Sequence, residues 1–391
     1  MSLLELLYSN ILKPGGLLIL NQKYMPDKRS IFIGTSVHRW NDNRIFYKEA
    51  VSLAYHFSVQ LHAPADFYYK TKQKVKVFGL PLWSKESDRK YIRRELWSRL
   101  KNSDSEIFYF HDPELIWIGI KARIFLGKKI VYDVHENTVE SIKGKKWLNT
   151  LTKGLAIIGY KLFEWIGKQL FNHFILAEDS YKILIPHNST IVLNYPIVEE
   201  SNGNSEQKLY DLVYLGDVRE DRGALIILEL INQLKKKREQ IKLALLGKIV
   251  NKEKFDIIIE KYCLEQNIKF FGYVDYQEAI NIVKKSKVGL CLLKPTQNFI
   301  HSYPTKLFDY MNAGIPFVSS NFQLYDELIQ KSNAGISVDP LNITEVINAV
   351  SKLLGDADYR DQLGQNGRSS LQTMFNWNTQ SIKLIDVINS L

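Results

Sequence analysis

The chain has 391 residues, which at about 150 residues per domain predicts two to three domains. Hydrophobic residues make up 45% of the chain and charged residues 24%, a balance that excludes a disordered or fibrous protein. Both cysteines, Cys263 and Cys291, are expected to be small buried residues of a reducing compartment. No cluster of cysteine and histidine has the spacing of a zinc site, so no structural metal is expected.

The formal net charge of +10 lies almost entirely in the first half of the chain. Residues 1–200 hold 29 Lys and Arg against 20 Asp and Glu, whereas residues 201–391 hold 23 against 22. This asymmetry indicates an anionic partner for the first half, either nucleic acid or a membrane surface. A lysine-rich composition that serves no partner is the alternative.

Neither a signal peptide nor a membrane-spanning helix is expected. Residues 1–7 have no positive charge before their apolar run, which makes a poor signal peptide. The other apolar runs fall far below the ~20 residues that cross a bilayer. The expected location is therefore the cytoplasm, with or without attachment to a membrane surface.

Short β-branched runs alternate with longer helical patterns along the chain, which predicts βαβ units and parallel sheets. The expected strands of the first half are residues 30–35, 58–61, 75–78, 107–110, 129–133 and 174–177. The expected helices there are residues 44–55, 89–101 and 147–171.

The polar segment 199–206 predicts a domain boundary, after which the same alternation resumes. The expected strands of the second half are residues 211–216, 241–247, 268–271, 288–293 and 316–319. The expected helices there are residues 223–236, 252–266, 276–285, 304–312, 325–332, 343–355 and 377–391. The simplest assembly is an α/β protein of two doubly wound domains that face a cleft, with ligands bound beyond the C-terminal ends of the strands.

Residues 301–316 hold the strongest local pattern, His-Ser-Tyr-Pro-Thr-Lys-Leu-Phe-Asp-Tyr-Met-Asn-Ala-Gly-Ile-Pro. Pro304 suits the first turn of a helix and Gly314 suits its end. The free N–H groups of Thr305 and Lys306 then favour an anion, and Asp309, about one turn on, suits two vicinal hydroxyls such as those of ribose. An ordinary solvated helix is the alternative.

A second pattern, residues 214–223 (Tyr-Leu-Gly-Asp-Val-Arg-Glu-Asp-Arg-Gly), links a strand to a helix. Gly216 lets the backbone approach a ligand there, and Arg222 points into the expected cleft. The alternative is an ordinary turn with two exposed arginines, Arg219 and Arg222. The loop 272–274 ends another strand, where its backbone either contacts a planar base or forms a plain turn.

Two histidines of the first half, His111 and His135, follow strands at the functional edge of the predicted sheet. Each suits a hydrogen bond to a substrate hydroxyl or phosphate, or a pairing with a neighbouring carboxylate. The loop 35–46 follows the first strand, where its backbone amides are placed to meet an anion.

Taken in order, these segments resemble the retaining glycosyltransferases of the GT-B fold, in the large group of nucleotide-sugar transferases known as family four. The resemblance extends from residue 31 to residue 389. It rests on segments 42–50 (Asp-Asn-Arg-Ile-Phe-Tyr-Lys-Glu-Ala), 111–113 (His-Asp-Pro), 132–136 (Tyr-Asp-Val-His-Glu), 193–196 (Leu-Asn-Tyr-Pro), 214–216 (Tyr-Leu-Gly), 303–311 (Tyr-Pro-Thr-Lys-Leu-Phe-Asp-Tyr-Met) and 375–377 (Phe-Asn-Trp).

The resemblance implies an acceptor-binding domain over residues 1–198, a donor-binding domain over 199–372 and a helix over 373–391 that crosses back to the first domain. It implies that Asp309 binds the donor ribose, Arg222 the diphosphate and His135 the transferred sugar, with Val274 beside the base. Lys306 is also expected to be catalytic, but only because of its position at the start of the predicted helix and not because of the resemblance. The remaining expected site residues are Gly216, Arg219, Tyr303 and Thr305 for the donor, and Asn43, His111 and His301 for the acceptor side of the cleft.

Three positions depart from the family pattern. His301 stands where a glutamate contacts the donor sugar, and Asp217 stands where the first basic residue of a diphosphate-binding pair is expected. Arg219 or Lys306 is expected to substitute for that basic residue. Residues 36–43 replace the glycine-rich loop after the first strand.

The resemblance implies transfer of a sugar from a UDP- or GDP-linked donor to a glycan or lipid-linked acceptor, with retention, in cell-surface polysaccharide synthesis. No acidic pair is placed to hold a metal, so no cofactor is expected. A sugar-nucleotide epimerase of the same fold is the alternative function.

Basic segments with interleaved aromatic residues, 85–101 and 143–168, favour an anionic membrane as the partner of the first domain. A solvated helix face is the alternative. The expected location is then the inner face of the membrane. Nucleic acid is not expected, since no recognised binding signature is present.

Overall fold

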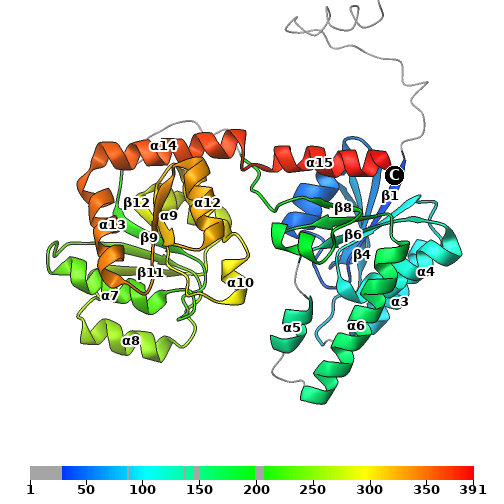
Figure 1. Ribbon diagram of the computed structural model, residues 1–391, viewed down its shortest axis with the longest axis horizontal. Helices are drawn as coiled ribbons and strands as arrows, with labels where there is room; N and C mark the ends of the chain where they lie inside the picture. The colour runs from blue at the N-terminus through cyan, green and yellow to red at the C-terminus, as the bar shows by residue number, and fades with distance from the viewer. Residues whose placement is uncertain (1–28, 86–87, 136–137, 145–148, 199–206) are drawn as a thin grey trace, which may run out of the picture.

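The computed structural model describes residues 29–391 apart from 86–87, 136–137, 145–148 and 199–206. Three predicted features therefore lie outside the described residues: the domain boundary at 199–206, the start of the helix expected over 147–171, and the first residues of the chain. The rest forms two α/β domains side by side, with the last two helices running along both of them (Figure 1). The predicted fold class is confirmed.

The first domain contains an eight-stranded sheet in the order β3-β4-β2-β1-β5-β6-β7-β8. All neighbouring strands are parallel except β3 and β4, which are antiparallel. The strands are β1 Ser30–Gly34, β2 Ser58–Pro64, β3 Tyr69–Lys72, β4 Val75–Leu80, β5 Ile107–Phe110, β6 Lys129–Val134, β7 His173–Leu176 and β8 Ser189–Ile191. The helices are η1 Asn43–Ala50, α2 Val51–Ala54, α3 Arg89–Lys101, η3 Pro113–Leu115, α4 Ile116–Leu126, α5 Thr138–Gly144, α6 Thr150–Leu170 and η4 Asp179–Ile183.

The second domain contains a six-stranded parallel sheet in the order β11-β10-β9-β12-β13-β14. Its strands are β9 Tyr210–Leu215, β10 Leu243–Leu246, β11 Ile268–Gly272, β12 Ser286–Cys291, β13 Phe317–Ser320 and β14 Gly335–Val338. Its helices are α7 Ala224–Lys235, α8 Lys252–Lys261, α9 Tyr276–Lys284, α10 Gln297–Ile300, α11 Thr305–Ala313, α12 Gln323–Ser332, α13 Ile343–Gly355 and α14 Ala357–Thr373, after which α15 Trp377–Ser390 follows.

Helices cover both faces of each sheet, so the central strands are apolar without alternation. All four residues of β5 and of β10 are buried. Each domain accordingly holds two hydrophobic clusters, one on either side of its sheet. The carboxyl ends of the strands are left for polar loops, where ligands of such sheets bind.

The C-terminal helix α15 packs on the first domain, against η1, α2 and β8. Trp377 and Leu384 belong to the hydrophobic cluster of that domain. The Trp377 indole donates a hydrogen bond to Ser52 Oγ at 2.8 Å, and its backbone N–H donates to the Pro196 carbonyl at 2.7 Å. The C-terminal helix α15 therefore forms part of the hydrophobic core of the first domain.

Several elements differ from the sequence prediction. The helix expected over 44–55 is divided into the π-helix η1 and the short α2. The helix expected over 252–266 ends at Lys261, and Cys263 lies in the following turn with φ of 52°. Its thiol is exposed, so the prediction that Cys263 is buried was wrong, whereas Cys291 is buried as predicted.

The elements that were not predicted are strands β3, β8 and β14, helices α4, α5, α10 and α14, and the short helices η3 and η4. Strand β3 is polar throughout, which hides it from hydrophobic periodicity. Helix α14 contains Gly364 and Gly367, and glycines inside a helical pattern indicate the end of a helix. A Cβ on Gly364 would lie 2.2 Å from the Gly314 carbonyl oxygen, so this glycine permits α14 to pack closely on the end of α11.

Replacing Leu384 by alanine tests the contribution of α15 to the first domain. Leu384 is fully buried, so we expect Leu384→Ala to lower the free energy of unfolding by about 2–5 kcal/mol. Urea unfolding followed by circular dichroism measures the loss. Ile382→Ala, on the exposed face of the same helix, is the matched control, and an equal loss in both variants would contradict the packing of α15.

Candidate functional site

Two glycines shape the loop that joins β9 to α7 in the second domain. Gly216 has φ of 122° and Gly223 has φ of 81°, which are left-handed conformations that favour glycine. A Cβ on Gly223 would lie 1.8 Å from the Leu292 carbonyl oxygen, so no larger residue fits. The loop thereby lies close to the chain that follows β12, at the carboxyl edge of the sheet.

Lys306 and Arg222 meet beside this loop. A Cβ on Gly216 would lie 3.4 Å from Lys306 Nζ and 3.5 Å from an Arg222 guanidinium nitrogen. Both cations line a cavity of about 230 Å³, together with Thr305, the first residue of α11. Lys306 Nζ is buried and has no hydrogen-bond partner, although it lies 3.9 Å from the centre of the Tyr214 ring.

The start of α11 adds to the positive charge. Pro304 precedes the helix as its N-cap, and no side chain caps the helix there. The first N–H groups therefore remain available to an anion, and the helix dipole favours negative charge at this end. Lys306, Arg222 and the start of α11, which we call the cationic cradle, suit a phosphate or diphosphate.

Burial sets the charge state of this region. Burial lowers the pKa of Lys306 to about 8, because the ammonium has lost its hydration and has gained no full partner. Burial raises the pKa of Asp309 to about 6. A bound anion would raise the pKa of Lys306 again and supply the partner that its ammonium lacks.

Asp309 lies one turn further along α11 and is buried. The hydroxyl of Tyr276 donates a hydrogen bond to its Oδ1 at 2.9 Å. Lys48 of the first domain is close enough to oppose the pKa rise of Asp309, which places a cation of that domain on the Asp309 side of the site. Val274, half-buried in the loop before α9, packs against the same hydrophobic cluster as Phe308.

A buried ionic network occupies the carboxyl edge of the first sheet. The Arg44 guanidinium donates to both carboxylate oxygens of Asp133, at 2.8 and 3.1 Å, and lies 2.9 Å from Glu49. Glu49 is in turn 2.6 Å from Nε2 of His111. Each of these side chains is at least nine-tenths buried.

Burial and the neighbouring charges shift the pKa values of the groups in this network. Although burial raises the pKa of Asp133, Arg44 holds it well below its usual value. Burial raises the pKa of Glu49 well above its usual value and lowers that of His111 to about 3, so the His111 imidazole is neutral near pH 7. Glu49, His111 and Asp133 offer ligand atoms within 4.8 Å of one another, but Arg44 already supplies the positive charge between the two carboxylates.

His135 follows β6 beside this network and remains partly exposed. Its Nδ1 lies 3.8 Å from Asp133 Oδ1, beyond hydrogen-bond distance. The ring contacts His111 and His38, with centroid distances of 5.6 and 5.3 Å. The network therefore fixes the surroundings of His135 and leaves its edge accessible.

Comparison with known proteins identifies the family. Residues 198–370 match the family model of the glycosyl transferases group 1. The chain is 26% identical over 293 residues to an uncharacterized glycosyltransferase of Methanocaldococcus jannaschii, which covers 69% of this chain and 70% of that protein. A shorter match, 32% over 76 residues, covers 19% of this chain and 20% of a GDP-mannose-dependent alpha-(1-6)-phosphatidylinositol monomannoside mannosyltransferase of Mycobacterium tuberculosis.

Residues 198–370 form a glycosyl transferases group 1 domain, and the protein is a glycosyltransferase. The predicted family and its enzyme class are confirmed.

Solved structures share the two-domain fold with this glycosyltransferase. Sucrose-phosphate synthase of Thermosynechococcus elongatus aligns with a TM-score of 0.69 at 12% identity, over 93% of this chain and 99% of that one. HepE of Anabaena, in complex with UDP, aligns with a TM-score of 0.66 at 13% identity, over 93% and 100%. WaaG, a glycosyltransferase involved in lipopolysaccharide biosynthesis, aligns with a TM-score of 0.64 at 14% identity, over 92% of this chain and 99% of that one. These likenesses confirm the GT-B fold.

Several predicted site residues of the glycosyltransferase lie away from the cationic cradle. The Arg219 guanidinium is bound to Asp221 at 2.8 and 3.0 Å, so Lys306 rather than Arg219 stands beside Arg222. His301 is exposed at the end of α10. Tyr303 packs into an aromatic cluster with Tyr195 and Phe308.

The first domain brings two corrections. His111, predicted in the cleft, is fully buried and paired with Glu49. The amides of the loop after β1, predicted to meet an anion, are occupied: Asp112 Oδ2 accepts from the backbone N–H of Ser36 at 2.5 Å and of Val37 at 3.3 Å. Asn43 is exposed at the start of η1.

The partners that hold the site residues in place were not predicted from the sequence. Arg44 and Glu49 belong to the segment 42–50, but nothing in that segment shows that they meet Asp133. Tyr276 and Lys48 were also missed. Charged residues inside an otherwise apolar helix were the available signal, because a buried charge needs a partner.

Removing the Arg222 side chain tests the cradle. We expect Arg222→Ala to lower turnover by about 10²–10³-fold, as for loss of a group that stabilises charge in the transition state. Release of UDP or GDP from a panel of nucleotide sugars measures it, with Arg238→Ala, exposed and outside the cradle, as the matched control. Full turnover in Arg222→Ala would contradict the assignment.

The pKa of Lys306 predicts a pH dependence of nucleotide binding. An anion stabilises the ammonium, so the pKa rises above about 8 in the complex. Above pH 8 the free enzyme loses a proton that the complex keeps, and affinity falls by up to about tenfold per pH unit. Calorimetry with UDP and GDP from pH 7 to pH 9.5 measures this fall, and Lys306→Met should abolish it. A flat profile in the unmodified enzyme would contradict the prediction.

Proposed function

We propose that this glycosyltransferase moves a sugar from a UDP- or GDP-linked donor to a glycan or lipid-linked acceptor, with retention, in cell-surface polysaccharide synthesis. One observation carries the proposal: the buried ammonium of Lys306 has no hydrogen-bond partner and lies beside Arg222 at the start of α11. A buried charge without a partner is costly, and a donor diphosphate would supply one.

The donor would lie along α11. Its diphosphate would bind the cationic cradle, and its ribose hydroxyls would donate to Asp309, which Tyr276 holds in place. Its base would contact the loop at Val274. The UDP complex of HepE and the GDP-mannose dependence named for the mycobacterial relative leave both nucleotides open.

Transfer would break the bond between the sugar C1 and the diphosphate oxygen and form a bond from C1 to an acceptor hydroxyl oxygen. Retention requires the hydroxyl to approach on the face from which the diphosphate leaves, so its proton passes to the leaving phosphate oxygen. Arg222, Lys306 and the helix dipole stabilise the charge that develops there. His135 would contact the transferred sugar. With these cations in place, we propose that transfer needs no metal ion.

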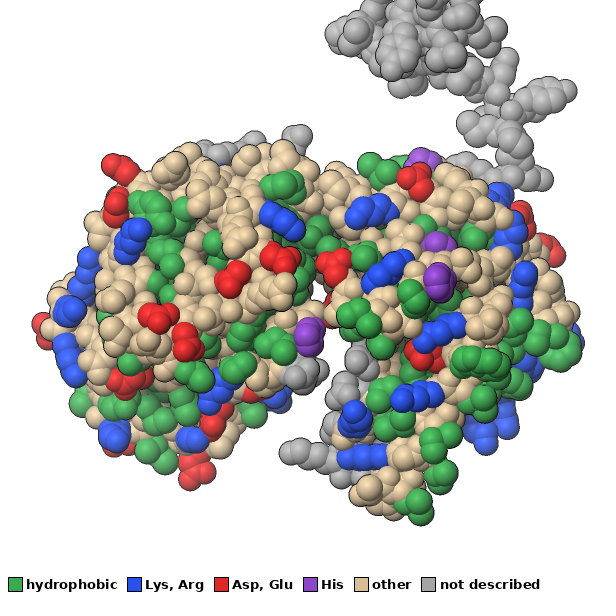
Figure 2. Space-filling view, viewed as in Figure 1, with side chains coloured by type: hydrophobic (Ala, Val, Ile, Leu, Met, Phe, Trp, Pro, Cys, Tyr) green, Lys and Arg blue, Asp and Glu red, His purple; other side chains and the backbone are tan. Residues whose placement is uncertain are grey.

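The surface of α6 supports attachment to an anionic membrane. Its outer face carries five apolar side chains, each more than half exposed, at intervals of three and four residues: Leu151, Leu155, Ile158, Leu162 and Trp165. We call this set the α6 stripe. Lysines lie on the same helix, and Figure 2 shows hydrophobic and basic side chains together over this part of the first domain. Such a surface suits the interface of an anionic bilayer.

The other predicted basic segment contributes less. Trp97 of α3 is half-buried against the core rather than exposed, and its ring lies 4.2 Å from Lys121 Nζ. No helix among the described residues is long and apolar enough to cross a bilayer. We therefore propose peripheral attachment through α6, at the cytoplasmic face of the membrane.

A thermal-shift screen of UDP, GDP and their sugars tests donor binding. A ligand at 100 times its Kd adds about 2.7 kcal/mol of stability, and we expect a shift with one nucleotide series that Lys306→Met removes. Turnover unchanged by EDTA is expected as well. No shift with either series would contradict the proposal, and conversion of a nucleotide sugar to an isomer without an acceptor would favour an epimerase.

Flotation with vesicles tests the α6 stripe. We expect binding to vesicles that contain phosphatidylglycerol and little binding to phosphatidylcholine alone, with Leu155→Glu reducing the bound fraction several-fold. Ile257→Glu, at an equally exposed isoleucine of α8, is the matched control. Equal binding to both vesicle types, or equal loss in both variants, would refute attachment through α6.

A further inference from the structure

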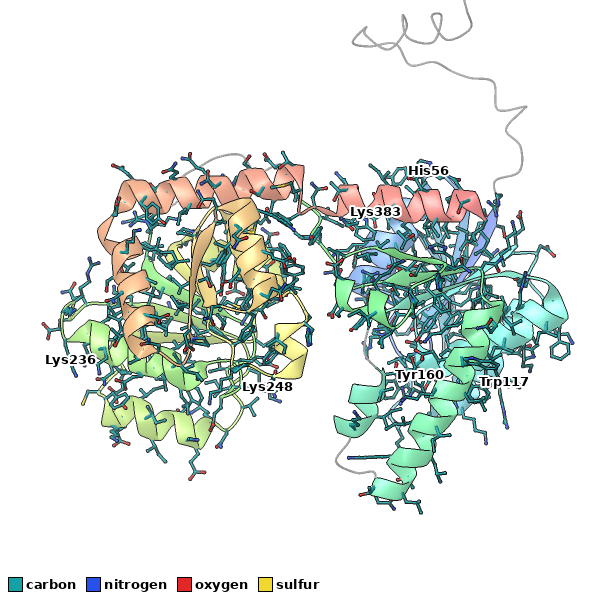
Figure 3. All side chains as sticks on the ribbon, viewed as in Figure 1. His56, Trp117, Tyr160, Lys236, Lys248 and Lys383 are labelled. Carbon is teal, nitrogen blue, oxygen red and sulfur yellow. The ribbon has the colours of Figure 1, made fainter. Side chains whose placement is uncertain are left out.

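The first domain contains a second, larger cavity of about 880 Å³ next to His135. Helices α4, α5 and α6 build much of its wall from apolar side chains, among them Ile142 and Phe163. Trp117 of α4 packs on Phe163 with a centroid distance of 5.5 Å. Figure 3 labels Trp117 together with Tyr160, which lines the cavity from α6. A cavity of this size with a largely apolar wall suits a small organic molecule.

The acidic and basic side chains of this wall balance one another. Among the described residues they are two arginines and two acids: Arg89, Arg93, Asp112 and Glu114. A guanidinium nitrogen of Arg93 lies 3.1 Å from Glu114, and one of Arg89 lies 3.4 Å from the same carboxylate. Asp112 is buried, and its Oδ2 accepts from Thr35 Oγ1 at 2.8 Å as well as from the loop amides described above. The formal charges of the four side chains sum to zero, so the wall favours a ligand without net charge.

The wall also offers an uncharged polar group to a ligand. Thr138, the first residue of α5, lines the cavity and is only 9% exposed. Its Oγ1 is buried and has no hydrogen-bond partner among the described residues. The Tyr160 hydroxyl, which is near enough to affect Thr138, donates to Glu164 Oε1 at 2.9 Å. A hydroxyl can both donate and accept, and leaving it unpaired in a buried place is costly, so Thr138 suits a hydroxyl group of the ligand.

The cavity extends from His135 to the outer surface of α4 and α6. His135 lines one part of it. Trp117 and Phe163 line another part and remain partly exposed. Phe163 belongs to α6, which also carries the α6 stripe. An elongated ligand can therefore place a hydroxyl near His135 while its apolar part lies against Trp117 and Phe163.

We propose that this cavity binds the acceptor, and that the acceptor is an uncharged amphiphile, a sugar or other polyol joined to an apolar chain. Its hydroxyl groups would lie between His135 and Thr138, and its chain would lie against Trp117 and Phe163. The inference rests on the proposed transferase function and specifies its acceptor class. An acceptor with a phosphate would bring a charge into a wall whose own charges are already paired, which is costly. A free glycan would leave the apolar wall in water.

Calorimetry of the full chain with three probes tests the proposal: octyl β-glucoside, octyl phosphate and glucose, with the amphiphiles below their micellar concentrations. We expect octyl β-glucoside to bind at least tenfold more tightly than either of the others. Octyl phosphate brings an unpaired charge, and glucose lacks the chain whose burial favours binding.

Two variants with matched controls locate the bound probe. Thr138→Val keeps the shape of the side chain and removes its hydroxyl, so it should weaken binding of octyl β-glucoside several-fold. Trp117→Ala removes an apolar contact and should weaken binding about tenfold. Thr344→Val, exposed in the first turn of α13, and Phe125→Ala, exposed on α4 itself, should bind as the unmodified protein does.

Transfer to the bound probe tests its role as acceptor. With a panel of UDP- and GDP-linked sugars, mass spectrometry should show octyl β-glucoside with one sugar added, and less of this product in Thr138→Val and Trp117→Ala. Bound octyl β-glucoside that receives no sugar, in a preparation whose unfolding temperature rises with UDP or GDP, would refute the acceptor role. Absence of that rise as well would count against the proposed transferase function, so the two failures are distinguishable.

The binding measurements can contradict each part of the proposal separately. Equal or tighter binding of octyl phosphate would remove the requirement for an uncharged ligand, and equal binding of glucose would remove the apolar chain. Binding that neither Thr138→Val nor Trp117→Ala weakens would place the probe outside the cavity. Absence of any binding would refute the site.

Discussion

The structure depends on two buried cations, Arg44 and Lys306, which differ in whether other groups of the protein pair with them. Arg44 is held by both oxygens of Asp133 and by the Val192 carbonyl, so its charge is balanced within the fold. Lys306 is equally buried, and its Nζ has no hydrogen bond. The first arrangement fixes loops that come from distant parts of the chain, and the second leaves a deficit that only a ligand can meet.

Several residues of the proposed donor side could be predicted from local signals in the sequence. Hydrophobic runs located the strands, and polar residues directly after them marked the carboxyl edge where a site forms. Lys306 and Asp309 could be predicted because their helix has local signals, Pro304 at its start and Gly314 at its end. Arg219 and Arg222 could not be separated in this way. Only the folded loop shows that Asp221 binds the first and leaves the second beside Lys306.

The acceptor side was less predictable because its properties arise from contacts between remote segments. His111 and His135 both follow strands in the sequence. In the structure His111 is buried and paired with Glu49, whereas His135 remains partly exposed. Asp112 likewise occupies amides that the sequence offered to a ligand. Cys263 shows the same limit on a smaller scale, since the helix predicted to end at residue 266 ends at Lys261, and Cys263 lies exposed in the turn that follows.

The unequal charge of the two halves of the chain corresponds to the two domains of the structure. The nearly neutral second domain needs only a few cations for the diphosphate that we propose there, because burial strengthens the interaction of each charge with it. The first domain spreads its positive charge over a surface, where single charges are screened. The anionic bilayer that we propose as its partner would therefore be attracted by many of these charges together.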